Sequence, residues 1–301
     1  VSTTPEPTLL GRYRVVERVA RGSFGRVLRM VDGDGTSRAL KIAAGMQGDR
    51  VALADRMLLA EFEQLARLEH PSLPRVFEVG RTPEAIDDVP AGAPFFVAEW
   101  IAGGRCDARR WDDPRALWSL LADLAGALAV IHAAGLVHGD VAPANIILAE
   151  TGAKAEGGTK SARDSTKSAR AVLVDLGLAA ETSARGTPAY MAPEQFGGAR
   201  DVDARADIYA AGILMYEAVT GRVPFSGGSI FDIMRAQVDE AAAPPRTLRP
   251  ELPEPVEAVI LTALQKDPAL RFQSAQAMAQ ALAHAAQALP QHEWIPLSSR
   301  G

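Results

Sequence analysis

Cysteine is almost absent, because the 301 residues contain only one, Cys106. A lone thiol cannot form an intrachain disulfide, so a reducing cytoplasm is the expected location. Long apolar runs are missing as well. No stretch of about 18 consecutive apolar residues occurs, which predicts that this chain neither spans nor contacts a membrane. Residues 1–7 lack the basic start and apolar core of a secretory signal, so none is expected.

Positive charge is scarce, and lysine is its scarcest source. The net charge of −5 argues against a basic face for nucleic acid, so no nucleic-acid partner is expected. Five lysines stand against 27 arginines, and three of the five lie within residues 154–167. The other two are Lys41 and Lys266. Because Lys41 lies in the apolar stretch 39–42, its ammonium group needs an anion nearby or a path to water.

The overall composition is typical of a folded globular protein. Hydrophobic residues make up 48% and charged residues 23% of the chain. These values exclude a disordered chain, a collagen and a simple coiled coil. The length of 301 residues corresponds to about two domains or one bilobal unit.

The first third of the chain predicts a sheet with one helix. Alternating, β-branched stretches predict strands, and apolar residues at three- and four-residue steps predict the helix. The expected strands cover residues 13–16, 25–31, 38–42, 75–80 and 94–101, and the expected helix covers residues 51–69. After residue 104 the pattern becomes mostly helical, with a helix over residues 113–135 and short strands at 145–148 and 171–174. This order predicts an α+β, two-lobed fold rather than a βαβ repeat.

The same patterns set the expected domain boundaries. We expect an N-terminal tail, an N-terminal lobe, a C-terminal lobe and a C-terminal tail at residues 1–11, 12–101, 102–288 and 289–301. Residues 149–170 are rich in Gly, Ala, Ser, Thr and Lys and contain Thr-Lys-Ser-Ala-Arg twice, which predicts a flexible insertion. A solvated linker, a regulatory phosphorylation loop and a docking site for an anion remain open for this segment.

Glycines within residues 20–27 predict a loop that contacts phosphate. Gly22 and Gly25 have no Cβ, so backbone amides can approach phosphate oxygens there. Two glycines between strands also suit a plain turn. Lys41 follows on a later strand, and Glu61 on the expected helix is the carboxylate that suits it. The alternative is a lysine that extends to water.

Two further motifs place polar side chains beside short strands. Within residues 137–145, Asp140 and Asn145 lie five residues apart on a loop that enters a strand. A carboxylate there can accept a hydroxyl proton, and an Asn oxygen can ligate Mg²⁺. Asp175 follows a Val-Leu-Val strand and supplies another hard oxygen ligand. The alternatives are a core histidine at His138 and a helix cap at Asp175.

Taken in order, these motifs resemble the eukaryotic-type (Hanks-type) serine/threonine protein kinases, including their bacterial branch. Further matches are the segments 186–194 (Gly-Thr-Pro to Ala-Pro-Glu), 207–212 and 266–271. The resemblance spans residues 12–288. It implies an α+β, bilobal protein-kinase-like fold, with a small β-rich N-terminal lobe that has one main helix and a larger helical C-terminal lobe.

The resemblance also implies roles for particular residues. Asp140 is the expected catalytic base, and Lys41 is expected to contact the ATP phosphates while it pairs with Glu61. Asn145 and Asp175 are the expected ligands of Mg²⁺, or of Mn²⁺ in its place. The expected nucleotide-binding residues are Ala20, Gly22, Ser23, Phe24, Gly25, Val27, Ala39, Lys41, Glu99 and Ile101.

Other positions of the family complete the expected site. Ala98 falls at the gatekeeper position, where a small side chain is expected to leave room beside the adenine. Glu194 is expected to pair with Arg271, and Asp207 is expected to accept backbone N–H bonds from the catalytic loop. The expected partners are proteins with Ser or Thr acceptors, because the 186–194 segment forms a peptide-docking platform in this family.

The sequence departs from the family pattern in ways that bear on regulation. Ala20 replaces a loop glycine, and Leu176 replaces the usual Phe. Gly139 replaces the Arg that binds a phosphorylated residue of the activation segment. Activity is therefore expected not to depend on phosphorylation of that segment.

The catalytic loop departs from the pattern in its charge as well. Ala142 stands where Ser/Thr kinases have a Lys, and Ala144 does not supply the Arg found in tyrosine kinases. Loss of one such donor costs about 3 kcal/mol of transition-state stabilisation. Another cation, such as Arg185, is a candidate to replace it.

Three functions are compatible with these motifs. The leading interpretation is an ATP- and Mg²⁺-dependent Ser/Thr protein kinase that transfers the γ-phosphoryl group to protein hydroxyls. Ala142 favours an alternative, a pseudokinase that acts as a nucleotide-binding or scaffolding module. A small-molecule phosphotransferase is the third, because residues 138–145 also look like the aminoglycoside and choline kinases, which lack the 186–194 segment.

Overall fold

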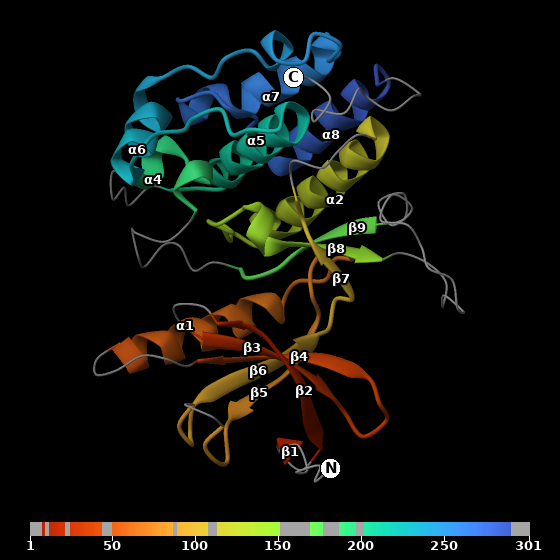
Figure 1. The fold of residues 1–301 in the computed structure, drawn as a ribbon, viewed down its shortest axis with the longest axis vertical. Helices are drawn as coiled ribbons and strands as arrows, with labels where there is room; N and C mark the ends of the chain where they lie inside the picture. Colours follow the sequence, from red (N-terminus) through yellow and green to blue (C-terminus); the bar gives the residue numbers. More distant parts are fainter. Residues whose placement is uncertain are drawn as a thin grey trace. The chain divides into compact units, whose positions relative to one another are not determined.

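The structure, a computed structural model, describes residues 8–9, 12–21, 25–43, 50–86, 89–107, 113–150, 169–176, 187–196 and 202–289. The chain divides into two compact units. The N-terminal unit comprises Val1–Glu69 and Pro74–Ile101, and the C-terminal unit comprises His70–Leu73 and Ala102–Gly301. Figure 1 labels the helices and strands of both units.

The N-terminal unit is built on a six-stranded sheet whose neighbouring strands are antiparallel (Figure 1). The strand order is β1-β2-β3-β4-β6-β5. The strands are β1 Thr8–Leu9, β2 Tyr13–Arg21, β3 Gly25–Val31, β4 Ser37–Ala43, β5 Val76–Arg81 and β6 Pro94–Glu99. Helix α1, Arg50–Leu65, packs against β4, β5 and β6.

Alternation along the strands of this sheet builds the core of the N-terminal unit. Met30 on β3, Leu40 and Ile42 on β4 and Val97 on β6 are fully buried. The two β4 residues are two positions apart, so their side chains leave the same face of the strand. The intervening residue Lys41 must therefore leave the opposite face.

Several boundaries in this unit differ from the sequence prediction, and strand β2 runs to Arg21 rather than to residue 16. Thr8–Leu9, expected in a tail, forms strand β1 and pairs with β2. Helix α1 ends at Leu65 rather than at residue 69. The amide of Leu68 bonds to the carbonyl of Leu65 at 3.1 Å, a three-residue spacing that tightens the chain and ends the helix.

The C-terminal unit combines a three-stranded sheet, in the order β7-β8-β9, with a set of helices (Figure 1). The strands are β7 Gly103–Arg105, β8 Ile146–Glu150 and β9 Ala169–Leu173. The α-helices are α2 Pro114–Ala133, α4 Pro193–Phe196, α5 Arg205–Thr220, α6 Ile230–Asp239, α7 Glu254–Ala263 and α8 Ala275–Ala286. The 3₁₀ turns are η1 Pro143–Asn145, η4 Pro188–Tyr190, η5 Pro245–Thr247 and η6 Pro268–Leu270. The two units together confirm the predicted α+β class.

Helix α5 forms the centre of the C-terminal unit. All residues from Ala206 to Thr220 are buried, and the helix contacts α2, α7 and α8. Gly212 permits the close approach to α7, because a Cβ at this position would lie 2.9 Å from the Cβ of Ala263. A polar side chain on α5, such as that of Asp207, is therefore held deep inside the unit.

Helix α2 is the one helix, among the residues described, with the length and hydropathy of a membrane span, over Ala116–Ala133. Half of that window is buried inside the protein. Its apolar stripe includes Leu121, Leu124 and Leu128, all buried, and the helix packs against α8 and β9. Such burial is typical of a core helix in a globular domain.

Strands β8 and β9 include the two ends of the predicted insertion at residues 149–170. Both ends of the segment belong to paired strands, since Ala149 pairs with Arg170 and Glu150 pairs with Ala169. Residues 151–168, to which the prediction of flexibility applies, lie outside the described residues. So do residues 290–301 of the expected C-terminal tail.

Candidate active site

Asp140 and Asn145 lie together on the loop that leads into strand β8. Turn η1 brings the amide of Asn145 back to Asp140, so that its Nδ2 donates to the backbone oxygen and to Oδ2 of Asp140, both at 2.8 Å. Asn145 is buried, with 8% of its surface exposed. Because both hydrogen bonds use the amide nitrogen, the amide oxygen is the atom available to a cation.

Asp207 on α5 holds this loop from below the surface. Its Oδ1 accepts the amide N–H of Gly139 at 2.7 Å, and its Oδ2 accepts that of His138 at 2.8 Å. Nε2 of His132, in the last turn of α2, lies 2.8 Å from the same Oδ2. Asp207 is 1% exposed, so water does not compete for these bonds. The backbone bonds are those that the family resemblance led us to expect.

His138 links the loop to the end of strand β9. Its side chain is fully buried, with Nε2 3.2 Å from the carbonyl of Val174 and Nδ1 3.3 Å from the amide of Asp140. Burial lowers the pKa of His138, an effect that the nearby charge of Asp207 opposes. A neutral ring that donates from Nε2 and accepts at Nδ1 satisfies both contacts. His138 is thus a hydrogen-bonded core histidine that also joins two functional segments.

Asp175 follows β9 with a backbone conformation that few residues adopt. Its φ is +58°, the one positive φ among the non-glycine residues that the structure describes. Asp tolerates this region better than most residues, yet a cost remains. The amide of Val174 bonds to the carbonyl of Asn145 at 2.9 Å. This backbone hydrogen bond places Asp175, the next residue, close to Asn145.

The donor set of these two residues fits a small, hard cation. Magnesium prefers oxygen ligands and is usually held by one or two protein side chains together with the phosphates of a substrate. Asn145 precedes β8 and Asp175 follows the paired strand β9, so the two residues supply an amide oxygen and a carboxylate from neighbouring segments. Within the described ranges, no group of three or more His, Cys, Asp or Glu side chains is placed to hold a metal without a substrate.

The segment with Gly-Thr-Pro and Ala-Pro-Glu contacts the catalytic loop at two points. The amide of Thr187 donates to Oδ1 of Asp140 at 3.2 Å. Gln195 Nε2 donates to the carbonyl of Gly139 at 3.2 Å, while its Oε1 accepts the amide of Ala192 at 2.8 Å. Sequence reasoning did not select Gln195 or His132, because neither residue type carries a signal for such a bridge.

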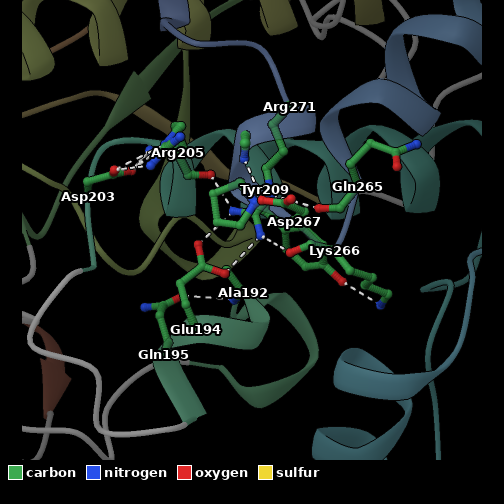
Figure 2. A network of polar contacts seen from close by, with 12 residues as sticks. Ala192, Glu194, Gln195, Asp203, Arg205, Tyr209, Gln265, Lys266, Asp267 and Arg271 are labelled. Atoms are coloured by element: carbon green, nitrogen blue, oxygen red, sulfur yellow. Dashed lines mark hydrogen bonds and ion pairs between the residues drawn. The ribbon is translucent and has the colours of Figure 1, made fainter.

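An ion pair anchors the far end of this segment (Figure 2). Arg271 donates to Glu194 through Nη1 at 2.6 Å and through Nη2 at 2.8 Å. The same guanidinium reaches the backbone carbonyls of Arg205, Gln265 and Lys266, and its side chain has no exposed surface. The pair that the family resemblance implied is therefore present, and it is fully buried on the arginine side.

The departures from the family pattern have structural correlates. Gly139 has a φ of +77°, so its lack of a Cβ removes the strain that another residue has there. Ala142 is fully buried. The exposed Ala144 offers its carbonyl to the guanidinium of Arg105 on β7, which brings one cation to the loop. Arg185 lies outside the described residues, as does Gly177.

In the N-terminal unit, Lys41 on β4 and Glu61 on α1 form a close ion pair. Lys41 Nζ lies 2.7 Å from both carboxylate oxygens of Glu61. The Lys41 side chain is 25% exposed and that of Glu61 is 9% exposed. The pair removes the cost of a lone ammonium on a half-buried strand. The sequence had left open a Lys41 side chain that extends to water, and the structure contains the ion pair instead.

Several of the other expected nucleotide-binding residues lie on neighbouring strands of the N-terminal sheet. Val27 pairs across the sheet with Lys41, and Ala39 lies two residues before Lys41, so these three side chains share one face. Ala39 pairs with Ala98 on β6, which is 7% exposed. Ala20 pairs with Val27.

Gly25 has a reason to be glycine that is independent of phosphate. A Cβ at this position would lie 2.3 Å from the carbonyl oxygen of Ile42, so the β3–β4 pairing itself excludes a side chain. Glu99 ends β6, with its amide bonded to the carbonyl of Arg75 at 2.8 Å, and Ile101 is buried. Three expected residues, Gly22, Ser23 and Phe24, lie outside the described residues.

A scan against models of protein families matches residues 13–294 to the protein kinase domain. The match covers nearly the whole chain, and the chain therefore belongs to the protein kinase family. Within that family its relatives are the Hanks-type serine/threonine kinases of bacteria.

Three such relatives illustrate the similarity. The DNA damage-responsive serine/threonine-protein kinase RqkA of Deinococcus radiodurans is 35% identical over 92% of this chain and 40% of its own length. The probable serine/threonine-protein kinase PknB of Corynebacterium glutamicum is 36% identical over 78% of this chain and 37% of its own length. The serine/threonine-protein kinase PknA of Mycobacterium tuberculosis is 32% identical over 92% of this chain and 62% of its own length. The chain thus spans between about a third and two thirds of these relatives.

Proposed function

We propose that this chain is the catalytic domain of an ATP- and Mg²⁺-dependent serine/threonine protein kinase, which transfers the γ-phosphoryl group to Ser or Thr hydroxyls of proteins. One observation carries the proposal. Asp140 and Asn145 form a hydrogen-bonded pair at 2.8 Å on a loop that the buried Asp207 fixes through two backbone amides. A buried carboxylate used only to orient a loop implies that the loop geometry matters for chemistry.

The proposed roles follow from the atoms that each residue presents. Asp140 accepts the proton of the substrate hydroxyl, because its carboxylate is oriented by Asn145 and by the amide of Thr187. Asn145 and Asp175 would hold the divalent ion, Mg²⁺ or Mn²⁺, which neutralises charge on the phosphates when bound. Lys41, oriented by Glu61, is proposed to bind the α- and β-phosphates.

The choice of protein hydroxyls as acceptors rests on the 187–194 segment. Small-molecule phosphotransferases with a similar catalytic loop lack this segment, whereas here it contacts Asp140 and is anchored by Glu194 and Arg271. The named activity of the bacterial relatives also favours Ser and Thr. A cytoplasmic location and the absence of nucleic-acid and membrane partners are part of the same proposal, supported by the net charge and the single cysteine.

One observation favours the pseudokinase alternative. The catalytic-loop side chains of Gly139, Ala142 and Ala144 carry no charge, and Ala142 is fully buried. Phosphoryl transfer depends on electrostatic stabilisation, so a loop without a cation is expected to be slower. The guanidinium of Arg105, which contacts the carbonyl of Ala144, is the described cation best placed to offset this loss.

A phosphorylation assay with Mg·ATP and mass-spectrometric site mapping tests the proposal. Wild-type protein is expected to phosphorylate Ser or Thr residues, and Asp140→Asn is expected to lose at least about a hundredfold in turnover. Asp34→Asn, in the exposed turn between β3 and β4, is the matched control. Ala142→Lys tests whether the missing cation limits the rate. ATP binding without any transfer would favour the scaffolding module instead.

We also propose that activity is independent of activation-segment phosphorylation. Gly139 supplies no cation for a phosphate on that segment, and its positive φ disfavours the Arg that other members have there. Thr182→Ala together with Ser183→Ala is expected to leave turnover within about twofold of wild type. A loss of about a hundredfold, comparable to that of a missing transition-state donor, would contradict this proposal.

A further inference from the structure

A chain of three hydrogen bonds runs from Lys266 to the backbone of the 187–194 segment. Lys266 Nζ donates to the hydroxyl of Tyr209 at 3.1 Å, and this hydroxyl donates to Oε1 of Gln237 at 2.5 Å. Nε2 of Gln237 then donates to the carbonyl of Ala189 at 2.8 Å. We call Lys266, Tyr209 and Gln237 the Gln237 network. Figure 2 shows Tyr209 and Lys266 beside Arg271.

Two of the three residues of the network are fully buried, which makes the bond between them strong and its disruption costly. Gln237 and Tyr209 have no exposed surface. A buried amide destabilises a protein unless both its ends are bonded, and Gln237 uses its oxygen and its nitrogen. The directions of donation are consistent along the chain, so each group has one role. An apolar side chain at this position of α6 would need no hydrogen-bond partner. The presence of an amide therefore indicates that its hydrogen bonds have a role.

The lysine end of the network is an unusual place for an ammonium group. Lys266 donates to the carbonyl of Gln237 and lies 3.7 Å from the centre of the Phe225 ring. Among the residues that the structure describes, no hydrogen bond or ion pair joins Lys266 to a carboxylate. Desolvation, followed by the nearby charge of Arg271, lowers the pKa of Lys266 to about 8. The ammonium fixes both Tyr209 and the end of α6.

The other end of the network lies two residues from a contact with the catalytic base. Ala189 is the middle residue of η4, and Thr187, two residues earlier, donates its amide to Oδ1 of Asp140 at 3.2 Å. Helix α6 packs against η4 and α4. The position of η4 relative to Asp140 is therefore coupled to Gln237 through a single peptide carbonyl.

We propose that Gln237 is a positioning residue for the protein substrate. Held by Tyr209 and Lys266, it fixes the Ala189 carbonyl and so the placement of the 187–191 segment beside Asp140. This inference rests on the proposed function for its kinetic consequence. The network should set the affinity for the protein substrate and leave the affinity for ATP unchanged, because its bonds lie in the segment assigned to peptide docking.

The test removes single polar groups from the network. Tyr209→Phe deletes the central hydroxyl and keeps the ring, which lies 4.8 Å from the Arg271 guanidinium carbon. Gln237→Leu deletes the bond to Ala189. Tyr216→Phe is the matched control, since Tyr216 lies on the same helix, is 2% exposed, and has no hydroxyl hydrogen bond to another residue that the structure describes.

Two readouts are compared across these variants. The first is the pair of KM values for peptide and ATP, and the second is the hydrogen exchange of the amides of residues 187–191. Tyr209→Phe and Gln237→Leu are expected to raise the KM for the peptide about tenfold, because each loses a buried hydrogen bond. The KM for ATP should stay within about twofold. Amide exchange in the segment should accelerate in both variants and remain unchanged in Tyr216→Phe.

Three results would overturn the inference. The first is unchanged exchange and unchanged peptide KM in both network variants. The second is an equal rise of both KM values, and the third is faster exchange in Tyr216→Phe as well, which would indicate general loosening of α5. If the wild-type protein phosphorylates no peptide, the proposed function fails while the exchange measurement still decides whether Gln237 positions the segment.

Discussion

Lys41 and Lys266 are the two lysines in the part of the chain that the structure describes, and they are held in opposite ways. Lys41, in the N-terminal unit, has a carboxylate within 2.7 Å and a side chain that is 25% exposed. Lys266, in the C-terminal unit, has backbone carbonyls, a tyrosine hydroxyl and the face of an aromatic ring around it. Lys41 has a carboxylate partner, whereas no hydrogen bond or ion pair among the described residues joins Lys266 to a carboxylate.

This difference in surroundings agrees with the two roles that we propose, phosphate binding for Lys41 and a structural role for Lys266. A carboxylate partner keeps an ammonium charged and oriented while part of it stays accessible to a ligand, as for Lys41. An ammonium surrounded by carbonyls has every proton directed inward and none left for a ligand. The depressed pKa of Lys266 reflects the desolvation that this arrangement brings. In the proposed function, Lys266 fixes a segment of the chain and Lys41 binds the phosphates.

The largest expected effect comes from removing the accessible lysine. Lys41→Met is expected to lower the turnover of phosphoryl transfer about a hundredfold, because a charged donor to the phosphates is lost. Lys266→Met should instead raise the peptide KM with little change in the ATP KM. Steady-state kinetics with both substrates varied distinguishes the two patterns.

Arg56→Met provides the control for this comparison. Arg56 is an exposed cation on α1, the helix that carries Glu61. Its replacement should leave both kinetic constants near the wild-type values. If Lys41→Met kept full turnover, the proposed distinction between the two lysines would be wrong.

A smaller effect is expected on the sheet face that carries Lys41. Ala98 pairs with Ala39, so two methyl groups stand where larger side chains are possible. We predict that the protein uses ATP analogues with a bulky N6 substituent, and that Ala98→Phe reduces their use relative to ATP about tenfold through steric exclusion. Competition assays with N6-benzyl-ATP measure this ratio. Rejection of every such analogue by the wild type, with ATP still used, contradicts the placement of Ala98.

The smallest effect concerns stability and sharpens the assignment of Lys266. Its pKa falls from 10.5 in an ordinary lysine to about 8. The unfolded chain therefore binds more protons than the folded chain between these values, so the free energy of unfolding should rise as pH increases through this window. Above pH 9 the buried Cys106 opposes the rise, because burial raises its thiol pKa from 9.0 to about 12.

Denaturant unfolding between pH 8 and 9 isolates the contribution of Lys266. Wild-type protein should become more stable across this interval, and Lys266→Met should show a flatter profile because the titrating group is gone. Identical slopes for the two proteins would show that Lys266 titrates near its ordinary value, and the desolvated placement would then be incorrect.

Strand patterns and the order of the motifs predicted most of the fold and the candidate site residues. Apolar and β-branched stretches predicted β3, β4 and β6 to within about two residues, since the apolar pattern of a strand is a local property of the sequence. The pairing of Lys41 with Glu61 followed from the cost of a lone buried ammonium. The prediction missed the end of β8 and the start of β9. Ala149, Glu150 and their partners resemble in composition the segment between the two strands, and only strand pairing distinguishes them.

The sequence by itself determined which residue types stand in which order, and hence the family and the identities of Asp140, Asn145 and Asp175 as candidates. The tertiary structure decided which other side chains and backbone groups hold those residues in place. His132, Gln195 and Gln237 became significant only when the fold brought their side chains to Asp207, to the catalytic loop and to Ala189, respectively. Polar contacts of this kind depend on the burial and distance of both partners, and no local pattern in a sequence encodes either quantity.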